Sequence, residues 1–279
     1  SIQSTCTSTF YAIYTGYNNN TIVNENEIIN TTSASLYGNY LYYCNNSTSS
    51  NNFIQNNISS SAQYIIYSYY GSANTISNNK ILDNQGGSSV AYGISLDYHS
   101  NGIVRGNQIT DLSSGTTTIG IYLYNSPLNV TNALVEKNIV QGVSSSGASS
   151  YTAGIASYYA HQSKIYNNSV SNISKTVATT NALYIPAGIQ IIYGNNLDIY
   201  HNTVHISGDF ASNVSGDLNS SALLVNYSGA NTLNIRNNTF TNVATGTQNS
   251  MLYAVLISDS TSLNGTTLNY NNYYTTGAN

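Results

Sequence analysis

Charge is the scarcest feature of this 279-residue chain, because Asp, Glu, Lys and Arg together make up only 6% of it, against about 25% in typical soluble domains. Six Lys and Arg and a net charge of −4 leave no basic patch that could neutralise a run of phosphates or hold an anionic membrane surface. We therefore expect no nucleic-acid partner. Amide and hydroxyl groups must supply the solubility that charge normally provides.

Long apolar runs and tryptophan are missing as well. No stretch approaches the roughly 20 unbroken apolar residues of a transmembrane helix, so we expect no membrane insertion by this segment. The aromatic residues are 27 Tyr and 4 Phe, so nearly every ring has a flat face and a hydrogen-bonding tip, which suits half-wet surfaces. The start at Ser1, with neither Met nor a signal-peptide pattern, is typical of a mature or excised piece of an exported protein.

Cysteine is nearly absent, with Cys6 and Cys44 as the two examples. In an oxidising compartment, a disulfide between them could join the N-terminal edge to the next repeat. Two buried free thiols would fit the sequence equally well.

The chain is rich in one repeated phrase: an apolar residue, two variable residues, Asn, one variable residue and another apolar residue. Examples are "ISNNKI" (76–81) and "IYNNSV" (165–170). A second phrase, a small residue followed by alternating apolar positions as in "YGISLDY" and "AGIQIIY", precedes most copies by a fixed interval. The shared asparagines recur about every thirty residues, at Asn26, Asn56, Asn79, Asn107, Asn138, Asn168, Asn202, Asn238 and Asn271.

Both phrases alternate with a period of two and are rich in Ile, Val and Tyr, which predicts short strands rather than helices. A unit of this length cannot bury its own apolar face, so it must stack on copies of itself. The sequence therefore predicts an all-β fold, a single-stranded parallel β-helix (β-solenoid) of about nine coils. Stacked asparagines can donate to one neighbour and accept from the other, which predicts an internal Asn ladder, and Asn tolerates the left-handed backbone that a tight bend needs.

The pattern "NNTI" and "NN.I" with an upstream "GI.L", over roughly residues 10–275, resembles the parallel β-helix repeat of the right-handed pectate-lyase-like superfamily, including NosD-type repeat proteins. This resemblance implies a right-handed coil and an extracellular location. The closing "NYNNYY" (269–274) is similar to segments of large surface proteins exported by the type 9 secretion route. We expect residues 1–279 to form one β-helix domain of a longer secreted or cell-surface protein.

The superfamily also contains polysaccharide lyases and glycoside hydrolases, so a carbohydrate-active enzyme is the alternative function. Such enzymes need carboxylates clustered on neighbouring coils, whereas the ten acids here are scattered along the chain. The sequence therefore favours a non-enzymatic structural or adhesive module, such as an adhesin, stalk or filament segment, with glycans or neighbouring copies as partners. It predicts no catalytic residue, and the four histidines lack the further ligands of a metal site.

Two sets of residues are candidates for ligand binding. Registering the coils places Tyr166, Tyr200 and Arg236 in one outward column, where stacked phenols and a guanidinium could hold a sugar ring. The same column could simply stiffen the sheet, which is the favoured interpretation.

The second set lies in the two longest loops, residues 174–186 and 207–221, which we expect to leave the same edge of the rod side by side. Asp209 and Asp217 in the second loop could bind Ca²⁺ weakly. Loops on a rigid scaffold often carry binding sites, but a solenoid also tolerates insertions there at little cost.

Overall fold

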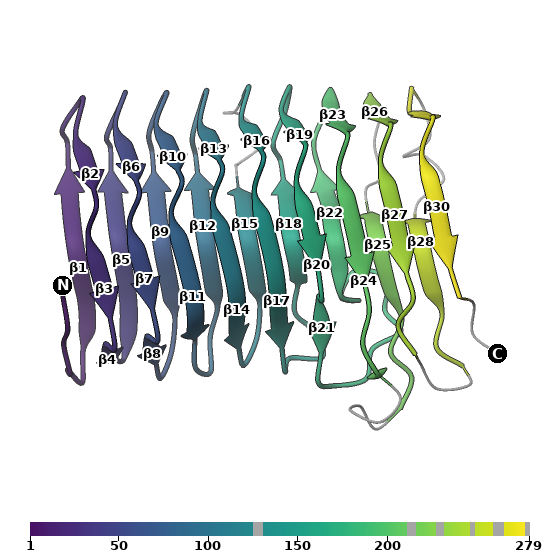
Figure 1. Ribbon diagram of the computed structural model, residues 1–279, viewed down its shortest axis with the longest axis horizontal. Helices are drawn as coiled ribbons and strands as arrows, with labels where there is room; N and C mark the ends of the chain where they lie inside the picture. The colour runs from purple at the N-terminus through teal and green to yellow at the C-terminus, as the bar shows by residue number, and fades with distance from the viewer. Residues whose placement is uncertain (125–130, 211–215, 227–231, 246–248, 259–264, 277–279) are drawn as a thin grey trace.

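The chain winds into a parallel β-helix in the computed structural model, which describes residues 1–124, 131–210, 216–226, 232–245, 249–258 and 265–276. Three sheets run along the rod, and each coil contributes one strand to each sheet (Figure 1). Every neighbouring pair of strands is parallel and joins successive coils, as in β1 with β5 (Thr9–Gly16 and Ser35–Tyr42). Nine strands along each sheet correspond to about eight full turns, close to the nine coils expected.

The sheets are numbered in the order in which a coil visits them. The first sheet contains β1 (Thr9–Gly16), β5 (Ser35–Tyr42), β9 (Gln63–Tyr69), β12 (Ala91–Asp97), β15 (Thr118–Tyr124), β18 (Thr152–Tyr158), β22 (Ala187–Tyr193), β25 (Ser220–Val225) and β28 (Leu252–Ile257). The second contains β2 (Ile22–Asn24), β6 (Thr48–Ser50), β10 (Thr75–Ser77), β13 (Ile103–Arg105), β16 (Leu134–Glu136), β19 (Lys164–Tyr166), β23 (Leu197–Tyr200), β26 (Leu233–Arg236) and β29 (Thr267–Asn269). The third contains β3 (Glu27–Ile29), β7 (Phe53–Gln55), β11 (Lys80–Gln85), β14 (Gln108–Ser114), β17 (Ile139–Ser145), β20 (Ser169–Ser171), β24 (Thr203–Ile206), β27 (Thr239–Asn242) and β30 (Asn272–Thr275), with the short strands β4 (Thr32–Ser33), β8 (Ile58–Ser59) and β21 (Ser174–Lys175) extending it.

One column of mainly apolar side chains from each sheet fills the interior. The column of the first sheet is Ile13, Asn39, Ile66, Ile94, Ile121, Ile155, Ile189, Leu223 and Val255. The column of the second is Val23, Ser49, Ile76, Val104, Val135, Ile165, Ile199, Ile235 and Leu268. The column of the third is Ile28, Ile54, Ile81, Ile109, Val140, Val170, Val204, Phe240 and Tyr273. Like residues stack on like, so each coil buries its apolar face on its neighbours.

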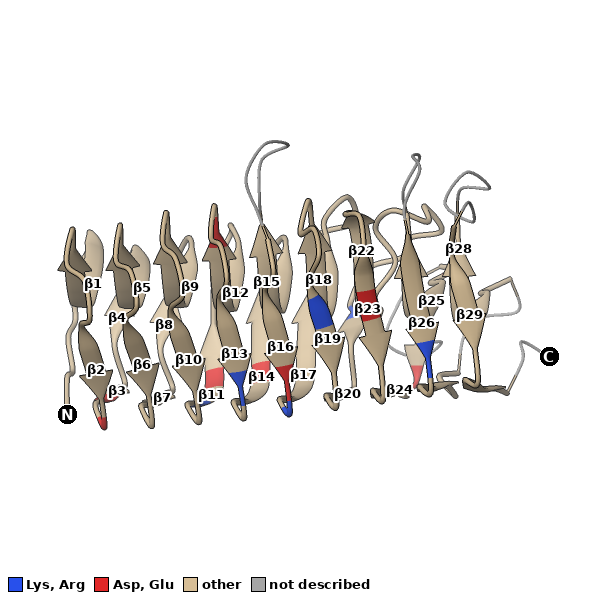
Figure 2. Cartoon of the chain, turned by 90° about the horizontal axis from the view of Figure 1, so that it is seen from above, with Lys and Arg blue, Asp and Glu red and all other residues tan. Residues whose placement is uncertain are grey.

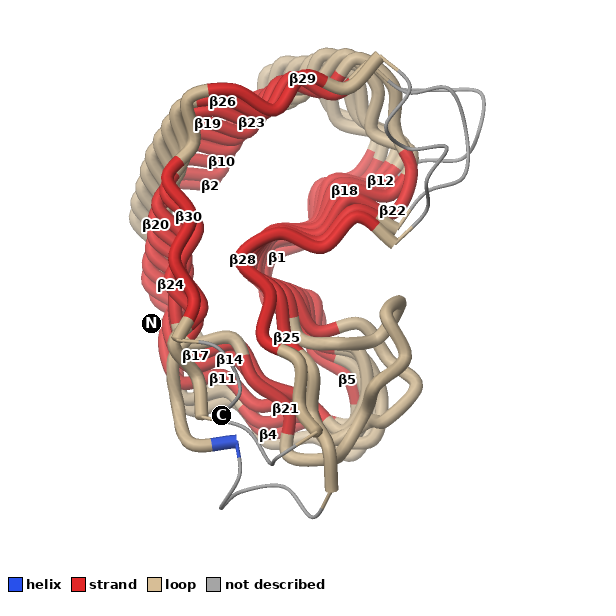
Figure 3. Tube along the Cα trace, turned by 90° about the vertical axis from the view of Figure 1, so that its right-hand side faces the viewer, coloured by secondary structure: helices blue, strands red, loops and turns tan. Residues whose placement is uncertain are grey.

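Strands of the first sheet bend toward the core, as the view along the rod shows (Figure 3). At the bend two consecutive side chains point inward, as with Ile65 and Ile66, both fully buried. Glycine is frequent at this position because the next coil is close: a Cβ on Gly120 would lie 2.6 Å from the carbonyl oxygen of Gly154. The "GI" of the second repeated phrase therefore marks a bend and the core residue that follows it.

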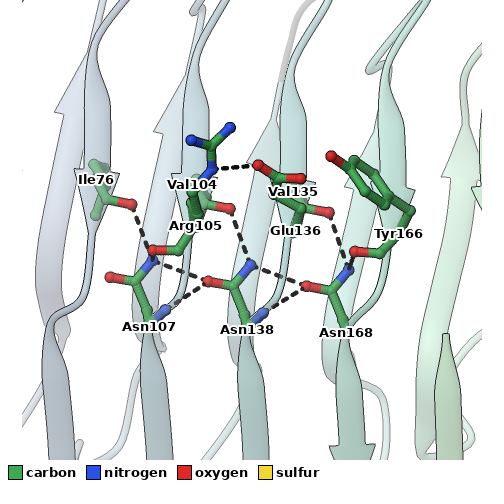
Figure 4. A network of polar contacts seen from close by, with 9 residues as sticks. All are labelled: Ile76, Val104, Arg105, Asn107, Val135, Glu136, Asn138, Tyr166 and Asn168. Atoms are coloured by element: carbon green, nitrogen blue, oxygen red, sulfur yellow. Dashed lines mark hydrogen bonds and ion pairs between the residues drawn. The ribbon is translucent and has the colours of Figure 1, made fainter. Parts of the chain in front are cut away.

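The predicted Asn ladder lies at the turn between the second and third sheets (Figure 4). Asn107 donates its backbone N–H (2.9 Å) and its Nδ2 (3.0 Å) to Oδ1 of Asn138 in the next coil, and Nδ2 also bonds the carbonyl oxygen of Ile76 (2.9 Å) in the preceding coil. The same pair of bonds links Asn26, Asn52, Asn79, Asn107, Asn138, Asn168, Asn202, Asn238 and Asn271. Each amide is thus satisfied by its neighbours without charge.

Two details of the ladder differ from the sequence prediction. The member in the second coil is Asn52, and Asn56 is an exposed residue with φ of 55° one turn later. The prediction was wrong because Ser49 occupies the apolar position of that coil, where its Oγ accepts from Nδ2 of buried Asn39 at 3.1 Å. The residue with left-handed backbone is the one before the ladder asparagine, such as Asn167 with φ of 54°. The ladder position therefore requires Asn for the hydrogen bonds of its amide and not for its tolerance of a left-handed backbone.

Within the described ranges, no helix is long and apolar enough to cross a membrane.

Candidate functional site

The two cysteines are free thiols, so the possible disulfide is not formed. Cys6 pairs through its backbone N–H with the carbonyl oxygen of Thr32, beside the third sheet. Cys44 is buried at the turn between the first and second sheets, where its thiol lies 3.5 Å from the carbonyl oxygen of Thr15. The residues sit at different corners of the coil, which explains why stacking does not bring them together.

Tyr166, Tyr200 and Arg236 lie together on the outer face of the second sheet, as the register predicts. The two rings stack with centroids 5.1 Å apart and planes 14° from parallel, and the Arg236 Cζ lies 5.6 Å from the Tyr200 centroid. Each Tyr200 face is therefore covered by a neighbour, and the column presents ring edges and hydroxyls outward. A sugar ring lying flat across both faces does not fit this geometry. In the second coil, Ser50 occupies this outward column.

The two long loops are adjacent, since Thr179 of the first bridges to Leu218 of the second. Asp209 accepts a hydrogen bond from Thr245 Oγ1 at 3.0 Å and lines a hollow of about 450 Å³ together with Asn172, Lys175 and Phe210. Asp217 itself is described, but residues 211–215, which link it to Asp209 along the chain, lie outside the described part. In the described ranges no group of three or more His, Cys, Asp or Glu gathers, and calcium binding at Asp209 and Asp217 stays a prediction.

Lys175, beside that hollow, is a buried cation that the sequence did not single out. Its Nζ donates to the carbonyl oxygens of Ser150 (2.6 Å), Gly147 (2.7 Å) and Ala148 (3.3 Å). Burial lowers the pKa of this ammonium to about 8. Because three carbonyl oxygens surround it, Lys175 orders the turn between β17 and β18 and is not free to hold a ligand.

A set of tyrosines on the outer face of the first sheet forms an extensive cluster of polar aromatic side chains that the sequence analysis did not predict. We call it the tyrosine face, and its members are Tyr11, Tyr14, Tyr37, Tyr40, Tyr42, Tyr64, Tyr67, Tyr69, Tyr92, Tyr122, Tyr124 and Tyr158. The inward bend of the strands places them on a curved wall (Figure 3), and most are half-buried. The face spans six successive strands, from β1 to β18.

Rings on neighbouring strands of the tyrosine face stack at distances close to the spacing between strands. Tyr37 stacks on Tyr11 and on Tyr64 with centroids 4.8 Å apart in both cases, and Tyr40 stacks on Tyr67 at 5.0 Å. Stacked rings turn their faces toward each other, so solvent meets their edges and hydroxyls. The edges carry the positive part of the ring quadrupole, which makes this surface attractive to oxygen atoms.

The buried phenols of the tyrosine face stay uncharged over the ordinary pH range, and a carboxyl interrupts the face at one point. Burial, with repulsion from neighbouring phenolates, raises the pKa of Tyr40 and raises that of Tyr64 to about 12. The phenols therefore remain neutral hydrogen-bond donors.

The one point is Asp97 on β12, which replaces tyrosine between Tyr69 and Tyr124 in the register. Its carboxylate accepts from Ser95 Oγ (2.5 Å) and from Tyr67 OH (2.9 Å) and is buried. Burial raises the pKa of Asp97 to about 6, although both hydrogen bonds lower it. A carboxyl that changes charge near pH 6 inside an aromatic surface is a group with functional potential.

The tyrosine face escaped the sequence analysis because of the bend. Strict alternation would put Tyr11 and Tyr14, three residues apart, on opposite faces of a strand. Ala12 and Ile13 both point inward, so the two tyrosines share the outer face. The repeated three-residue spacing in "YAIY", "YGNY" and "YIIY" was the available signal.

Comparison with known proteins gives one family and no curated relative. The family described as right handed beta helix region matches residues 2–153, and the sequence matches no curated protein. Among solved structures, the chain is similar to the A-module of the Azotobacter vinelandii mannuronan C-5 epimerase AlgE4, with 12% identity, a TM-score of 0.31, and coverage of 96% of this chain and 87% of that one. It is also similar to QnrB1, a plasmid-mediated fluoroquinolone resistance protein, with 6% identity, a TM-score of 0.23, and coverage of 88% and 93%.

The family match covers more than half of the chain and includes the first five of the nine ladder asparagines and most of the tyrosine face. It agrees with the parallel coil and the three continuous sheets described above. This chain therefore belongs to the right-handed β-helix family.

Proposed function

We propose that this protein is a non-catalytic, extracellular binding rod that holds an extended, neutral sugar chain along its tyrosine face. The observation that carries the proposal is the connected set of outward tyrosines from β1 to β18, whose stacked rings have centroids 4.8 to 5.0 Å apart. Ser95, Asp97 and Ile119 interrupt its columns. Phenol hydroxyls donate and accept hydrogen bonds, and ring edges attract ether and hydroxyl oxygens. Sugars present those groups at every residue.

Repetition supports an extended partner over a small molecule. Strands of a sheet lie about 4.8 Å apart, so phenol hydroxyls and ring edges recur along most of the successive coils from β1 to β18, on a backbone that the ladder and core hold rigid. A partner that repeats along its own length can engage many of these contacts at once, and binding at several linked points raises the overall affinity. The low charge of the chain and its amide and hydroxyl surface suit a location outside the cell, where such a rod would act as an adhesive or spacer segment.

A carbohydrate-active enzyme is the second candidate, and Asp97 is the observation that favours it. Its raised pKa is what a general acid near pH 6 requires. Glycoside hydrolysis, however, uses a pair of carboxylates. On the described strands of the tyrosine face, Asp97 has Ser95 and Tyr67 as its hydrogen-bonding partners rather than a second acid. A binding role therefore accounts for more of this surface than catalysis does.

Screening the whole chain against an array of neutral and charged glycans, followed by calorimetric titration of the hits, tests the proposal. We expect neutral, linear glycans to bind, and we expect the double variant Tyr37→Ala/Tyr40→Ala to weaken binding at least tenfold, or about 1.4 kcal/mol. Tyr274→Ala, an exposed tyrosine on the third sheet, is the matched control and should bind as the parent does. Equal binding by the parent and the double variant would refute the role of the tyrosine face.

The enzymatic candidate is separated by incubating each bound glycan with the parent and with Asp97→Asn and analysing the products. Intact glycan after prolonged incubation agrees with a binding rod. Cleavage or isomerisation that the Asp97→Asn variant abolishes would replace our proposal with the enzymatic one.

A further inference from the structure

Although charge is scarce in this chain, its cations are concentrated on the outer face of the second sheet from β13 to β26 and in the turn that follows it. Four of the six Lys and Arg are there, namely Arg105, Lys137, Lys164 and Arg236. Figure 2 looks onto these strands and shows the coloured bands gathered on them. The face is separate from the tyrosine face, which belongs to the first sheet.

Acidic groups on this face are already engaged. Glu136 is buried and forms an ion pair with Arg105, and Asp198 accepts a hydrogen bond from Asn234 Nδ2 at 3.0 Å. In the part of the chain that the structure describes, Lys164, Lys137 and Arg236 make no ion pair with a carboxylate. Asp198 lies directly opposite Lys164 in the register, so this face carries four cations against two carboxylates, an excess of positive charge.

The register sets these cations around the two stacked tyrosines. Lys164 lies two residues before Tyr166 on β19, so both side chains point outward. Arg236 lies on β26, directly beside Tyr200 of β23 and two strands along the sheet from β19. Lys164 and Arg236 are thus about 10 Å apart along the rod, two strand spacings, with Tyr200 and Asp198 in the strand between them. Burial raises the pKa of Tyr200, so its hydroxyl stays a neutral donor.

From this arrangement we infer a second binding site, specific for an anionic sugar chain, on the second sheet around Lys164, Tyr166, Tyr200 and Arg236. Sulfate or carboxylate groups of the chain pair with Lys164 and Arg236, whose guanidinium can take an oxyanion through two parallel hydrogen bonds. Sugar hydroxyls meet the edges and hydroxyls of the two phenols and the exposed His201, whose ring lies 5.5 Å from that of Tyr200. The site uses ring edges, consistent with the stacked geometry, and differs from a flat sugar platform.

The occupant is a sugar chain and not nucleic acid or an acidic peptide. Nucleic-acid binding needs many phosphate contacts, whereas this face offers three unpaired cations on a molecule of net charge −4. A peptide would be expected to find exposed apolar pockets or a sheet edge, and the site presents phenol, imidazole and amide groups instead. Hydroxyl-rich rings with regularly placed anions match both the cations and the polar groups between them.

Three polymers with one backbone test the inference: dextran, carboxymethyl dextran and dextran sulfate, titrated into the whole chain at low and high salt. We expect both anionic forms to bind and neutral dextran not to bind at this site, with binding lost between about 0.05 M and about 0.5 M salt. The better of the two anionic forms identifies whether sulfate or carboxylate is the preferred group. In the Tyr37→Ala/Tyr40→Ala variant, which lacks the tyrosine-face site, dextran that binds as tightly as dextran sulfate at both salt concentrations would overturn the site.

Variants then locate the binding. Lys164→Gln/Arg236→Gln should weaken dextran sulfate binding at least tenfold, and Tyr200→Leu, which keeps the charges, should weaken it severalfold. Lys80→Gln on the third sheet is the matched control, because Lys80 is an exposed cation on another face. An equal loss with Lys80→Gln, unchanged binding in the double variant, or equally tight binding of poly-glutamate would each overturn the inference. The tyrosine-face variant Tyr37→Ala/Tyr40→Ala should bind dextran sulfate as the parent does. Its binding of neutral glycans tests the proposed function, and its binding of dextran sulfate tests this second site.

Discussion

Asn79 directs two hydrogen bonds at a single atom, the Oδ1 of Asn107: one from its backbone N–H at 3.0 Å and one from its Nδ2 at 2.9 Å. Both residues are fully buried or nearly so. One amide oxygen thus satisfies a turn N–H and a side chain of the neighbouring coil, and the same arrangement holds the coils together along the rod.

The first prediction concerns the identity of the ladder residue in the second coil. Asn52→Ala leaves the backbone N–H and Nδ2 of Asn26 without their acceptor, so we expect a loss of about 3 kcal/mol or more in the free energy of unfolding. Asn56→Gly should change it by less than about 0.5 kcal/mol, because Asn56 is exposed with left-handed φ. Denaturant titration of both variants measures the difference. A larger loss of unfolding free energy in the Asn56 variant than in the Asn52 variant would show that Asn56 is the ladder residue, as the sequence predicts.

Asp97 gives the second prediction. Its folded pKa, about 6, lies above the ordinary 3.8, so the folded state holds the proton more tightly and stability falls as pH rises from about 4 to about 6. Two pKa units correspond to about 3 kcal/mol. Ser95 and Tyr67 donate to different oxygens of Asp97, so Asp97→Asn keeps one of the two oxygen acceptors and removes the charge. Its unfolding free energy should exceed that of the parent above pH 6 and approach it near pH 4, as followed by denaturant melts across this range.

His99 should show the opposite dependence. It is buried, and burial lowers its pKa to about 4 from 6.5. The unfolded chain therefore takes up a proton between pH 6.5 and 4 that the folded chain does not, and stability is lost as pH falls through this window, by up to about 3 kcal/mol. His99→Leu should flatten that loss while changing stability near pH 7.5 only modestly. An unchanged acid limb in the variant would show that other groups cause it.

Lys175 is expected to act locally. Lys175→Met removes the donor that three carbonyl oxygens of residues 147–150 share, so amide hydrogen exchange in the turn between β17 and β18 should accelerate at least tenfold. The global melting temperature should change much less, because the core columns are untouched. Lys80→Met, at an exposed site, is the control and should leave exchange at residues 147–150 as in the parent.

The fold and most of the ladder could be predicted from the sequence because stacking repeats the same physical demand at every coil. Val104 and Asn107 meet the same kinds of neighbours as Val135 and Asn138. The same residue types therefore recur at the same positions in successive coils, and each copy strengthens the prediction for the others. The ladder residue was predicted wrongly in the one coil where a polar pair, Asn39 and Ser49, replaces apolar residues in the core.

The tyrosine face could not be predicted by alternation, because a backbone bend changes which side chains share a face. The raised pKa of Asp97 depends on burial by residues from three coils, including Tyr67 in the preceding one. Neither a bend nor such burial is expressed in the spacing of a single strand. The arrangement of the tyrosines on one face is therefore visible only in the folded chain, although the tyrosines themselves stand out in the composition.

The ladder also gives the rod a direction. Every side-chain amide accepts from the coil before it and donates to the coil after it, so the amide dipoles point the same way and their positive ends face the C-terminal coils. A duplicated coil inserted at any rung would find a donor on one side and an acceptor on the other, with no amide left over. The molecule can therefore lengthen in whole coils during evolution, one unit at a time, without redesigning its interior.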